Sequence, residues 1–301
     1  MTSTDGTTTG GTGDTGDAAG DATRRGAVLV TGCSSGIGHA TAARLVADGH
    51  VVYATARRPE TLEALAAAGA RTLELDVTDE SSMRTAVAEV EREHGAVGVL
   101  VNNAGYGEYG PVEEVPLEAV RRQFETNVFG LGRMCQLVLP GMRAAGRGRI
   151  VNIGSMGGRI TFPTGGWYHA SKYAVEALTD ALRVEVAPFG VDVVLVEPGL
   201  TRTEFGDVAS QGLSRGGDDG PYAALRATSD QVTERNYRSR NAVGPDVIAG
   251  VVAKAVESEH PRSRYLVTPA AKALVATRLL GGDRVWDAVV RRSFDLPSSP
   301  A

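Results

Sequence analysis

The amino-acid sequence predicts an α/β fold in which a doubly wound parallel sheet is covered by helices on both faces. Short apolar runs alternate with segments of helical length, and the runs are apolar at nearly every residue, as in Ala27-Val-Leu-Val-Thr31. Such strands are buried on both faces, because parallel neighbours need crossover connections that cover the sheet. With 301 residues and 42% hydrophobic content, the chain is long enough for one substantial core, so we expect a single domain.

The expected elements follow one another in a regular order. The first strand runs through a Gly-rich turn into a helix with apolar residues at helical spacing, and Gly49 ends this helix. The next two strands also lead into helices, and the alternation continues after them. Strands are predicted at 27–31, 51–55, 72–75, 97–101, 149–153, 191–196 and 264–268, and helices at 37–48, 60–68, 80–94, 117–143, 168–187 and 245–257.

Two segments depart from this alternation. Residues 1–25 are rich in Thr, Gly and Asp and have no aromatic or branched aliphatic side chain, so we expect a disordered tail before a domain over 26–301. Residues 201–244 are Gly-rich and charged, with little periodicity, notably over 212–220. A long stretch of this kind is either disordered or functional, and its position after a strand favours an insertion or lid over the substrate.

Composition narrows the possible functions. Charged residues make up 22% of the chain and the net charge is -5, so no basic field is available for nucleic acid or an acidic membrane, and a small-molecule partner is expected. Cys33 and Cys135 are far apart and the histidines lack ligand spacing, so we expect neither a disulfide framework nor a metal site. Without a signal-peptide pattern or an apolar stretch of roughly 18 residues, a soluble cytoplasmic protein is expected.

The turn after the first strand has the composition of a phosphate-binding loop. Its sequence, Thr31-Gly-Cys-Ser-Ser-Gly-Ile-Gly38, places glycines where a tight turn and a close approach to phosphate need them. The following helix offers unpaired N–H groups and a partial positive charge to a pyrophosphate. A purely structural turn is the alternative, but the position between strand and helix favours a dinucleotide. The expected contacts are Gly32, Ser34, Ser35, Gly36, Ile37 and Gly38.

The residues after the second strand indicate which dinucleotide binds. An acidic residue there favours NAD by binding the ribose hydroxyls, whereas this chain has Ala56-Arg57-Arg58. The planar guanidinium of Arg57 suits a 2′-phosphate, and Ser34 or Ser35 would add a hydroxyl donor. An ordinary solvated pair of arginines is the alternative. We expect NADP(H) to be the cofactor.

Further cofactor-binding candidates lie beyond the carboxyl ends of the next two strands, where sheets of this type bind ligands. Asp76 and Val77 follow the third strand, and Asp76 either accepts a hydrogen bond from the adenine amino group or caps the next helix. Asn103, Ala104 and Gly105 follow the fourth strand. Small residues there form either a wall against a nucleoside or a simple turn.

Tyr168 and Lys172 are candidates for acid/base chemistry. They are four residues apart, so on the predicted helix they share a face, and Ser155 follows the fifth strand. An ammonium stabilises a phenolate, so Lys172 is expected to lower the pKa of Tyr168. Tyr168 would then give a proton to a substrate oxygen that Ser155 holds by a hydrogen bond. The alternative is a Tyr and a Lys on an ordinary amphipathic helix.

Asn127 lies within Glu125-Thr-Asn-Val-Phe-Gly130, inside a stretch that is otherwise helical. A buried asparagine has two donors and an acceptor. It could bend the helix, satisfy the core, or order a water between Lys172 and solvent and so relay protons.

In order and spacing, these motifs resemble the short-chain dehydrogenase/reductase family, over residues 26–268. The resemblance is to its single-domain branch, and the segments 32–35 and 52–57 are similar to NADP-preferring hydroxysteroid and retinol dehydrogenase-like members. The matching features are Thr31-Gly-x-x-x-Gly-Ile-Gly38, Asn102-Asn-Ala-Gly105, Asn127, Ser155, Tyr168-x-x-x-Lys172 and Pro198-Gly199.

The resemblance implies a Rossmann-like sheet, a homodimer or homotetramer, and a reversible hydride transfer between NADP(H) and a carbonyl or secondary alcohol. It implies that Lys172 also binds the nicotinamide ribose and that Pro198, Gly199 and Thr203 flank the nicotinamide. The alternative is an NADP-binding regulator or scaffold with little catalytic role, because one fold hosts many functions. The substrate is open between steroid, retinoid, fatty or polyketide-derived carbonyls and sugars. The implied catalytic tetrad is Asn127, Ser155, Tyr168 and Lys172.

Overall fold

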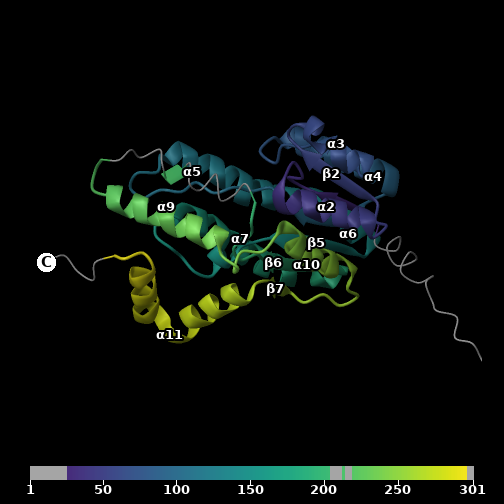
Figure 1. The fold of residues 1–301 in the computed structure, drawn as a ribbon. Helices are drawn as coiled ribbons and strands as arrows, with labels where there is room; N and C mark the ends of the chain where they lie inside the picture. Colours follow the sequence, from purple (N-terminus) through teal and green to yellow (C-terminus); the bar gives the residue numbers. More distant parts are fainter. Residues whose placement is uncertain (1–25, 204–211, 214–218, 297–301) are drawn as a thin grey trace, which may run out of the picture.

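The computed structural model describes residues 26–203, 212–213 and 219–296, and it has the predicted doubly wound architecture (Figure 1). Seven parallel strands form one sheet in the order β3-β2-β1-β4-β5-β6-β7. The order reverses direction between β1 and β4, which is where ligands bind in sheets of this type. The strands are β1 (Ala27–Val30), β2 (Val52–Ala56), β3 (Arg71–Glu74), β4 (Val97–Asn102), β5 (Gly148–Ile153), β6 (Val191–Glu197) and β7 (Arg264–Leu266).

Helices cover both faces of the sheet and bury two separate apolar layers. On one face α4 (Glu80–His94), α6 (Leu131–Ala145) and α7 (Gly166–Val186) pack against side chains such as Leu29 and Leu100. On the other face α2 (Gly36–Ala47), α3 (Glu63–Ala67) and α10 (Pro245–Glu257) pack against Val28 and Val30. Alternate residues of β1 therefore enter opposite layers, as its uniformly apolar sequence predicts.

Two predicted helices are less regular than expected. The segment near 60–68 begins as a 3-10 turn, η1 (Pro59–Leu62), before α3. The expected helix over 117–143 is three elements, because α5 (Leu117–Phe124) passes into a π-helical turn, η2 (Glu125–Gly130), before α6 begins. A π-helical turn widens the backbone locally and is frequent at functional sites. Here it carries Asn127.

The segment 201–244 contains a helix that its weak periodicity did not predict, α9 (Ala223–Arg238). Another unpredicted helix, α11 (Pro269–Ser293), follows β7 and is kinked at Gly282. Figure 1 shows α9 and α11 at the left, beyond the sheet. The expected tail over 1–25 and part of 212–220 lie outside the described residues.

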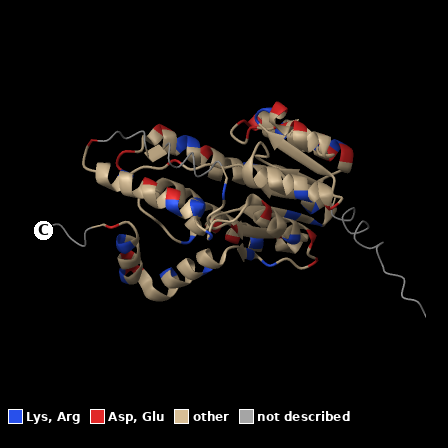
Figure 2. Cartoon of the chain, viewed as in Figure 1, with Lys and Arg blue, Asp and Glu red and all other residues tan. Residues whose placement is uncertain are grey.

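Acidic and basic residues are interspersed along the outer helices, as the colouring of Figure 2 shows. Cys33 and Cys135 are buried free thiols, and burial raises the pKa of each to about 12. Across the part of the chain that the structure describes, no helix combines the length and apolar character needed to cross a bilayer.

Candidate active site

The Gly-rich loop joins β1 to α2 and is shaped by close backbone contacts. Gly32 has a φ of 71°, and a Cβ there would lie 2.8 Å from the Cα of Ala104. A Cβ on Gly38 would lie 2.2 Å from the carbonyl oxygen of Gly32. Ser35 is the N-cap of α2 but its side chain makes no capping hydrogen bond. The first turn of α2 therefore keeps N–H groups available for an anion, which fits the pyrophosphate of a dinucleotide.

Asn103 fastens the end of β4 to this loop. Its Nδ2 donates to the carbonyl oxygens of Thr31 and Gly32, each at 2.9 Å. The backbone N–H groups of Asn103 and Ala104 both donate to Thr31 Oγ1 at 3.0 Å. The side chain of Asn103 is thus committed to holding the Gly-rich loop, while Ala104 and Gly105 form the adjoining edge.

The side chain of Asp76 forms hydrogen bonds within its own loop, and its contact with the adenine amino group stays a prediction. Its Oδ1 accepts hydrogen bonds from Thr78 N at 2.9 Å and Thr78 Oγ1 at 2.7 Å, which closes a local turn. The cap of α4 is Asp79, so the expectation that Asp76 caps this helix is wrong. Asp79 is the N-cap because it directly precedes the first residue of α4 and its carboxylate accepts hydrogen bonds from the N–H groups of Ser81 and Ser82.

Arg57 and Val77 follow β2 and β3 at the same edge of the sheet. Arg57 is exposed and follows Ala56, the last residue of β2. Val77 is buried and packs against the π-helical turn, because a Cβ on Gly130 would lie 2.5 Å from the Val77 carbonyl oxygen. An exposed guanidinium beside the Gly-rich loop is available for a ligand phosphate.

Ser155, Tyr168 and Lys172 converge beyond β5. The Ser155 Oγ accepts a hydrogen bond from Gly157 N at 3.0 Å and caps η3 (Met156–Gly158), which fixes its loop. Tyr168 and Lys172 lie one turn apart on α7, both buried, and the side chain of Tyr168 is hydrogen-bonded to Ser155. Lys172 Nζ donates to the carbonyl oxygen of Ile153 at 2.9 Å. The sequence spacing thus places a phenol, a hydroxyl and an amine at one strand end.

The acid/base properties of this group differ from the expectation. Burial raises the pKa of Tyr168 to about 12, and the hydrogen bond with Ser155 opposes it only in part. The prediction that Lys172 lowers the pKa of Tyr168 is therefore wrong for this structure, because desolvation of the phenolate dominates. Burial also lowers the pKa of Lys172 to about 8, against the opposing charge of Glu176. Near neutral pH the tyrosine is a neutral phenol, which suits a proton donor.

Two further tyrosines, Tyr109 and Tyr237, lie near Tyr168 and were not predicted as site residues from the sequence. The ring of Tyr109 lies 5.6 Å from that of Tyr168. Burial, together with Tyr168 and Tyr237, raises the pKa of Tyr109 well above its ordinary value. Tyr237 comes from α9, and burial followed by the charge of Tyr168 raises its pKa as well. The helix within 201–244 therefore contributes an aromatic side chain near Tyr168.

Contacts with the loop after β4 hold α9 in this position. Tyr222, its N-cap, donates from its hydroxyl to Glu113 Oε2 at 2.7 Å. Arg226 is buried and forms an ion pair with Glu114. These bonds join two segments more than a hundred residues apart in sequence, so sequence periodicity could not reveal them.

Asn127 is engaged with the loop after β4. Its Nδ2 donates to Tyr106 O at 2.8 Å and to Ser171 Oγ at 3.1 Å, while its Oδ1 accepts from Tyr106 N at 3.0 Å. Both amide donors are thus used by the protein itself. From the π-helical turn, Asn127 joins the loop at Tyr106 to Ser171 of α7.

The loop after β6 contacts both other loops of the site. Pro198 accepts a hydrogen bond at its carbonyl oxygen from Met156 N at 2.9 Å. A Cβ on Gly199 would lie 2.2 Å from Thr268 Oγ1, and a Cβ on Gly36 would lie 3.4 Å from the methyl group of Thr203. Pro198, Gly199 and Thr203 are therefore brought to the same strand edge as the Gly-rich loop and Ser155.

His169 connects α7 to the loop after β5, a contact that its sequence position next to Tyr168 does not predict. Its Nδ1 lies 3.1 Å from the Gly157 carbonyl oxygen, so it joins α7 to the loop that carries Ser155. Its ring also packs on Phe162, which in turn contacts Trp286 of α11. Burial lowers the pKa of His169 to about 4, so the imidazole is neutral in the folded protein. Within the described residues, no group of three His, Cys, Asp or Glu side chains could hold a metal.

The buried neutral state of His169 predicts a loss of stability in acid. Its folded pKa of about 4 lies below the ordinary value of 6.5, so the unfolded chain binds the extra proton between these values. The free energy of unfolding should fall as the pH drops from 6.5 to 4, by about 3 kcal/mol at most. Urea unfolding at several pH values should show a shallower fall in His169→Asn, which keeps a donor but does not titrate. His260→Asn, at an exposed position, is the control, and an unchanged slope in His169→Asn would contradict the assignment.

Comparisons with known proteins agree with this geometry. A family model described as short chain dehydrogenase matches residues 26–213. The 3-ketodihydrosphingosine reductase of Bacteroides thetaiotaomicron is 40% identical over 251 residues, which cover 83% of this chain and 90% of that protein. The NADPH-dependent 3-dehydrocapnine reductase of Ornithobacterium rhinotracheale is 36% identical over 270 residues, with coverages of 87% and 94%.

A solved structure of a short-chain dehydrogenase from Streptomyces avermitilis is also similar. It is 34% identical, has a TM-score of 0.74, and the match covers 88% of this chain and 97% of that one. The chain therefore belongs to the short-chain dehydrogenase/reductase family, whose members are oxidoreductases that bind a nicotinamide cofactor.

Proposed function

We propose that this protein is an NADP(H)-dependent oxidoreductase that interconverts a ketone and a secondary alcohol. The observation that carries the proposal is the hydrogen-bonded pair of Tyr168 and Ser155, with Lys172 one turn away, at the strand edge that also bears the Gly-rich loop. A proton donor, an oxygen-binding hydroxyl and a phosphate-binding loop on one edge are the parts that carbonyl reduction needs.

The side chains divide the work as follows. Ser155 and Tyr168 bind the carbonyl oxygen, and Tyr168 gives its proton to that oxygen as charge develops there. When bound, NADPH supplies the hydride that reaches the carbonyl carbon. Tyr168 carries its proton at neutral pH, as a proton donor in the reducing direction must. Lys172, one turn from Tyr168, would bind the nicotinamide ribose and lie on the path by which Tyr168 regains its proton. Asn127 positions α7 against the loop at Tyr106.

The preference for NADP(H) is supported by the exposed guanidinium of Arg57 at the end of β2. The position after this strand meets the 2′ group of the adenosine ribose in such folds, and a carboxylate there would repel a phosphate. One relative, at 36% identity, is itself named NADPH-dependent. Ser34, exposed in the Gly-rich loop, adds a hydroxyl near the same edge.

For the substrate we propose a ketone in a largely apolar molecule. The described groups near Tyr168 include the aromatic rings of Tyr109 and Tyr237, which offer apolar faces and hydroxyl tips. A relative with 40% identity is named a 3-ketodihydrosphingosine reductase, which gives a first compound to test. A sugar would instead need several hydrogen-bonding side chains to replace water at its hydroxyls.

Removing the hydroxyl of Tyr168 should abolish turnover while leaving cofactor binding intact. With NADPH and 3-ketodihydrosphingosine, a steroid ketone and an aldose as substrates, the rate is followed by NADPH absorbance. Tyr168→Phe should lose at least about a hundredfold in kcat because the general acid is gone. Tyr173→Phe, exposed on the same helix, is the matched control. Near-normal turnover in Tyr168→Phe would disprove the acid/base role, and tight NADPH binding without turnover on any ketone would favour a regulator.

Removing the guanidinium of Arg57 should weaken NADPH binding selectively. Loss of a charge-assisted contact costs about 1.5–3 kcal/mol, so Arg57→Ala should raise the Kd for NADPH about tenfold to a hundredfold. The Kd for NADH should stay nearly the same, since NADH has no 2′-phosphate. Arg262→Ala, an exposed arginine near the start of β7, is the control. Equal weakening of both cofactors, or of neither, would contradict the role of Arg57.

A further inference from the structure

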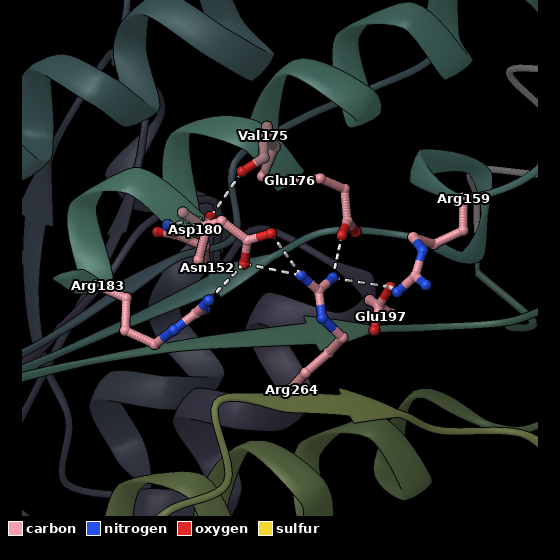
Figure 3. A network of polar contacts seen from close by, with 9 residues as sticks. Asn152, Arg159, Val175, Glu176, Asp180, Arg183, Glu197 and Arg264 are labelled. Atoms are coloured by element: carbon pink, nitrogen blue, oxygen red, sulfur yellow. Dashed lines mark hydrogen bonds and ion pairs between the residues drawn. The ribbon is translucent and has the colours of Figure 1, made fainter.

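A cluster of charged side chains, of which Glu176 and Glu197 are buried, joins α7 to β6 and β7 (Figure 3). Glu176 follows Lys172 by one turn on α7, and Glu197 is the last residue of β6. Arg264 Nη1, from β7, donates to Glu176 Oε2 and lies 3.3 Å from Glu197 Oε1. Two carboxyl groups from different elements therefore share one guanidinium nitrogen.

The two carboxyl groups are buried and incompletely paired. Glu197 is 0% exposed and Glu176 is 7% exposed. Within the described part of the chain, Glu176 Oε1 and Glu197 Oε2 have no hydrogen-bond partner. Two carboxylates side by side in a buried site cannot both be ionised cheaply, and a proton held between them gives each unpaired oxygen a partner.

This carboxyl pair adjoins the loop that holds Ser155. A Cβ on Gly154 would lie 3.4 Å from Glu176 Oε1, and a Cβ on Gly158 would lie 3.0 Å from the same atom. Gly154 precedes Ser155 and Gly158 is the last residue of η3, so Glu176 packs against this loop. The pair is thus in contact with the Ser155 loop and on the same helix face as Lys172.

We propose that Glu176 is a positioning residue of the active site, which shares a proton with Glu197 and, when that proton leaves, supplies the negative charge that keeps Lys172 protonated. The inference rests on the proposed function only in taking charged Lys172 as the active form. Burial and Glu197 raise the pKa of Glu176 to about 8, close to the lowered pKa of Lys172. As the pH rises, Glu176 loses its proton and becomes negatively charged. This charge raises the pKa of Lys172, so Lys172 stays protonated at a pH where it would otherwise lose its proton.

The other groups that face Glu176 do not replace it in this role. Asp180 is bonded to Arg264 Nη2 at 2.8 Å and to Arg183 at 2.7 Å, so its charge is directed toward arginines. Arg159 lies 3.5 Å from Glu197 Oε1. The titratable or charged groups around Glu176 are Lys172, Tyr173, Asp180 and Arg183 from α7, Glu197 from β6, Arg264 from β7 and Arg159 after η3.

The first test uses the pH dependence of activity. Glu176→Gln keeps the shape but cannot carry charge, so the alkaline limb of kcat/KM should move to lower pH by about one unit, a tenfold loss at pH 9. Activity near pH 6.5 should change little. Glu197→Gln leaves Glu176 ionised at lower pH, so it should move the limb in the opposite direction. Glu185→Gln, exposed on α7, is the matched control. Coincident alkaline limbs in all four proteins would overturn the proposal.

A second measurement needs no substrate and separates this proposal from the proposed function. The folded protein holds a proton on Glu176 above the ordinary carboxyl pKa, so the free energy of unfolding should fall as the pH rises from 4.5 to about 8. Glu176→Gln should lack this fall. The alkaline limb of NADPH binding, followed by tryptophan fluorescence, should shift in the same variants. If the free energy of unfolding of Glu176→Gln has the same pH dependence as that of the wild type, the proposal of a shared proton is wrong, even where turnover is normal. If these two shifts occur and no ketone is turned over, only the proposed function fails.

Discussion

Backbone hydrogen bonds between parallel strands impose the constraint on which this active site depends. Because all seven strands run in the same direction, the loops that follow them meet at one edge of the sheet. The Gly-rich loop after β1, the Asn103 turn after β4, Ser155 after β5 and Pro198 after β6 are brought together in this way. Contacts between these loops then fix them against each other, through Asn103 to Thr31 and Gly32 and through Met156 to Pro198.

Desolvation is the second physical effect that shapes the chemistry. It raises the pKa of Tyr168 and lowers that of Lys172, so it favours the neutral form of both side chains. The first change suits a proton donor. The lowered pKa of Lys172 disfavours its charged form. Glu176, one turn after Lys172 on α7 and paired with Glu197 of β6, lies where its charge can oppose this effect. Buried charges are costly unless they are paired, and Arg264 and Arg159 both lie against the buried carboxyl group of Glu197.

The sequence predicted the parts of the molecule that local pattern determines. Short, mostly apolar runs located the strands, and the spacing of Tyr168 and Lys172 placed both on one face of α7. It did not predict features that depend on distant contacts. The π-helical turn forms where Asn127 bonds to Tyr106 across a loop, and α9 is held by Glu113 and Glu114 from another segment. Tyr109, Tyr237 and Glu176 have no motif of their own. Two aspartates near one helix start, Asp76 and Asp79, could not be separated without the backbone geometry.

In the proposed reaction, Ser155 and Tyr168 together bind the oxygen of the carbonyl group whose carbon is reduced. A crystal structure of the protein with NADP+ and the alcohol product of an accepted ketone tests it most directly. We expect the product hydroxyl to lie about 3 Å from both Ser155 Oγ and Tyr168 Oη, with the nicotinamide between this pair and Pro198-Gly199. A product hydroxyl bound away from Tyr168, with the cofactor elsewhere than the Gly-rich loop, would contradict it.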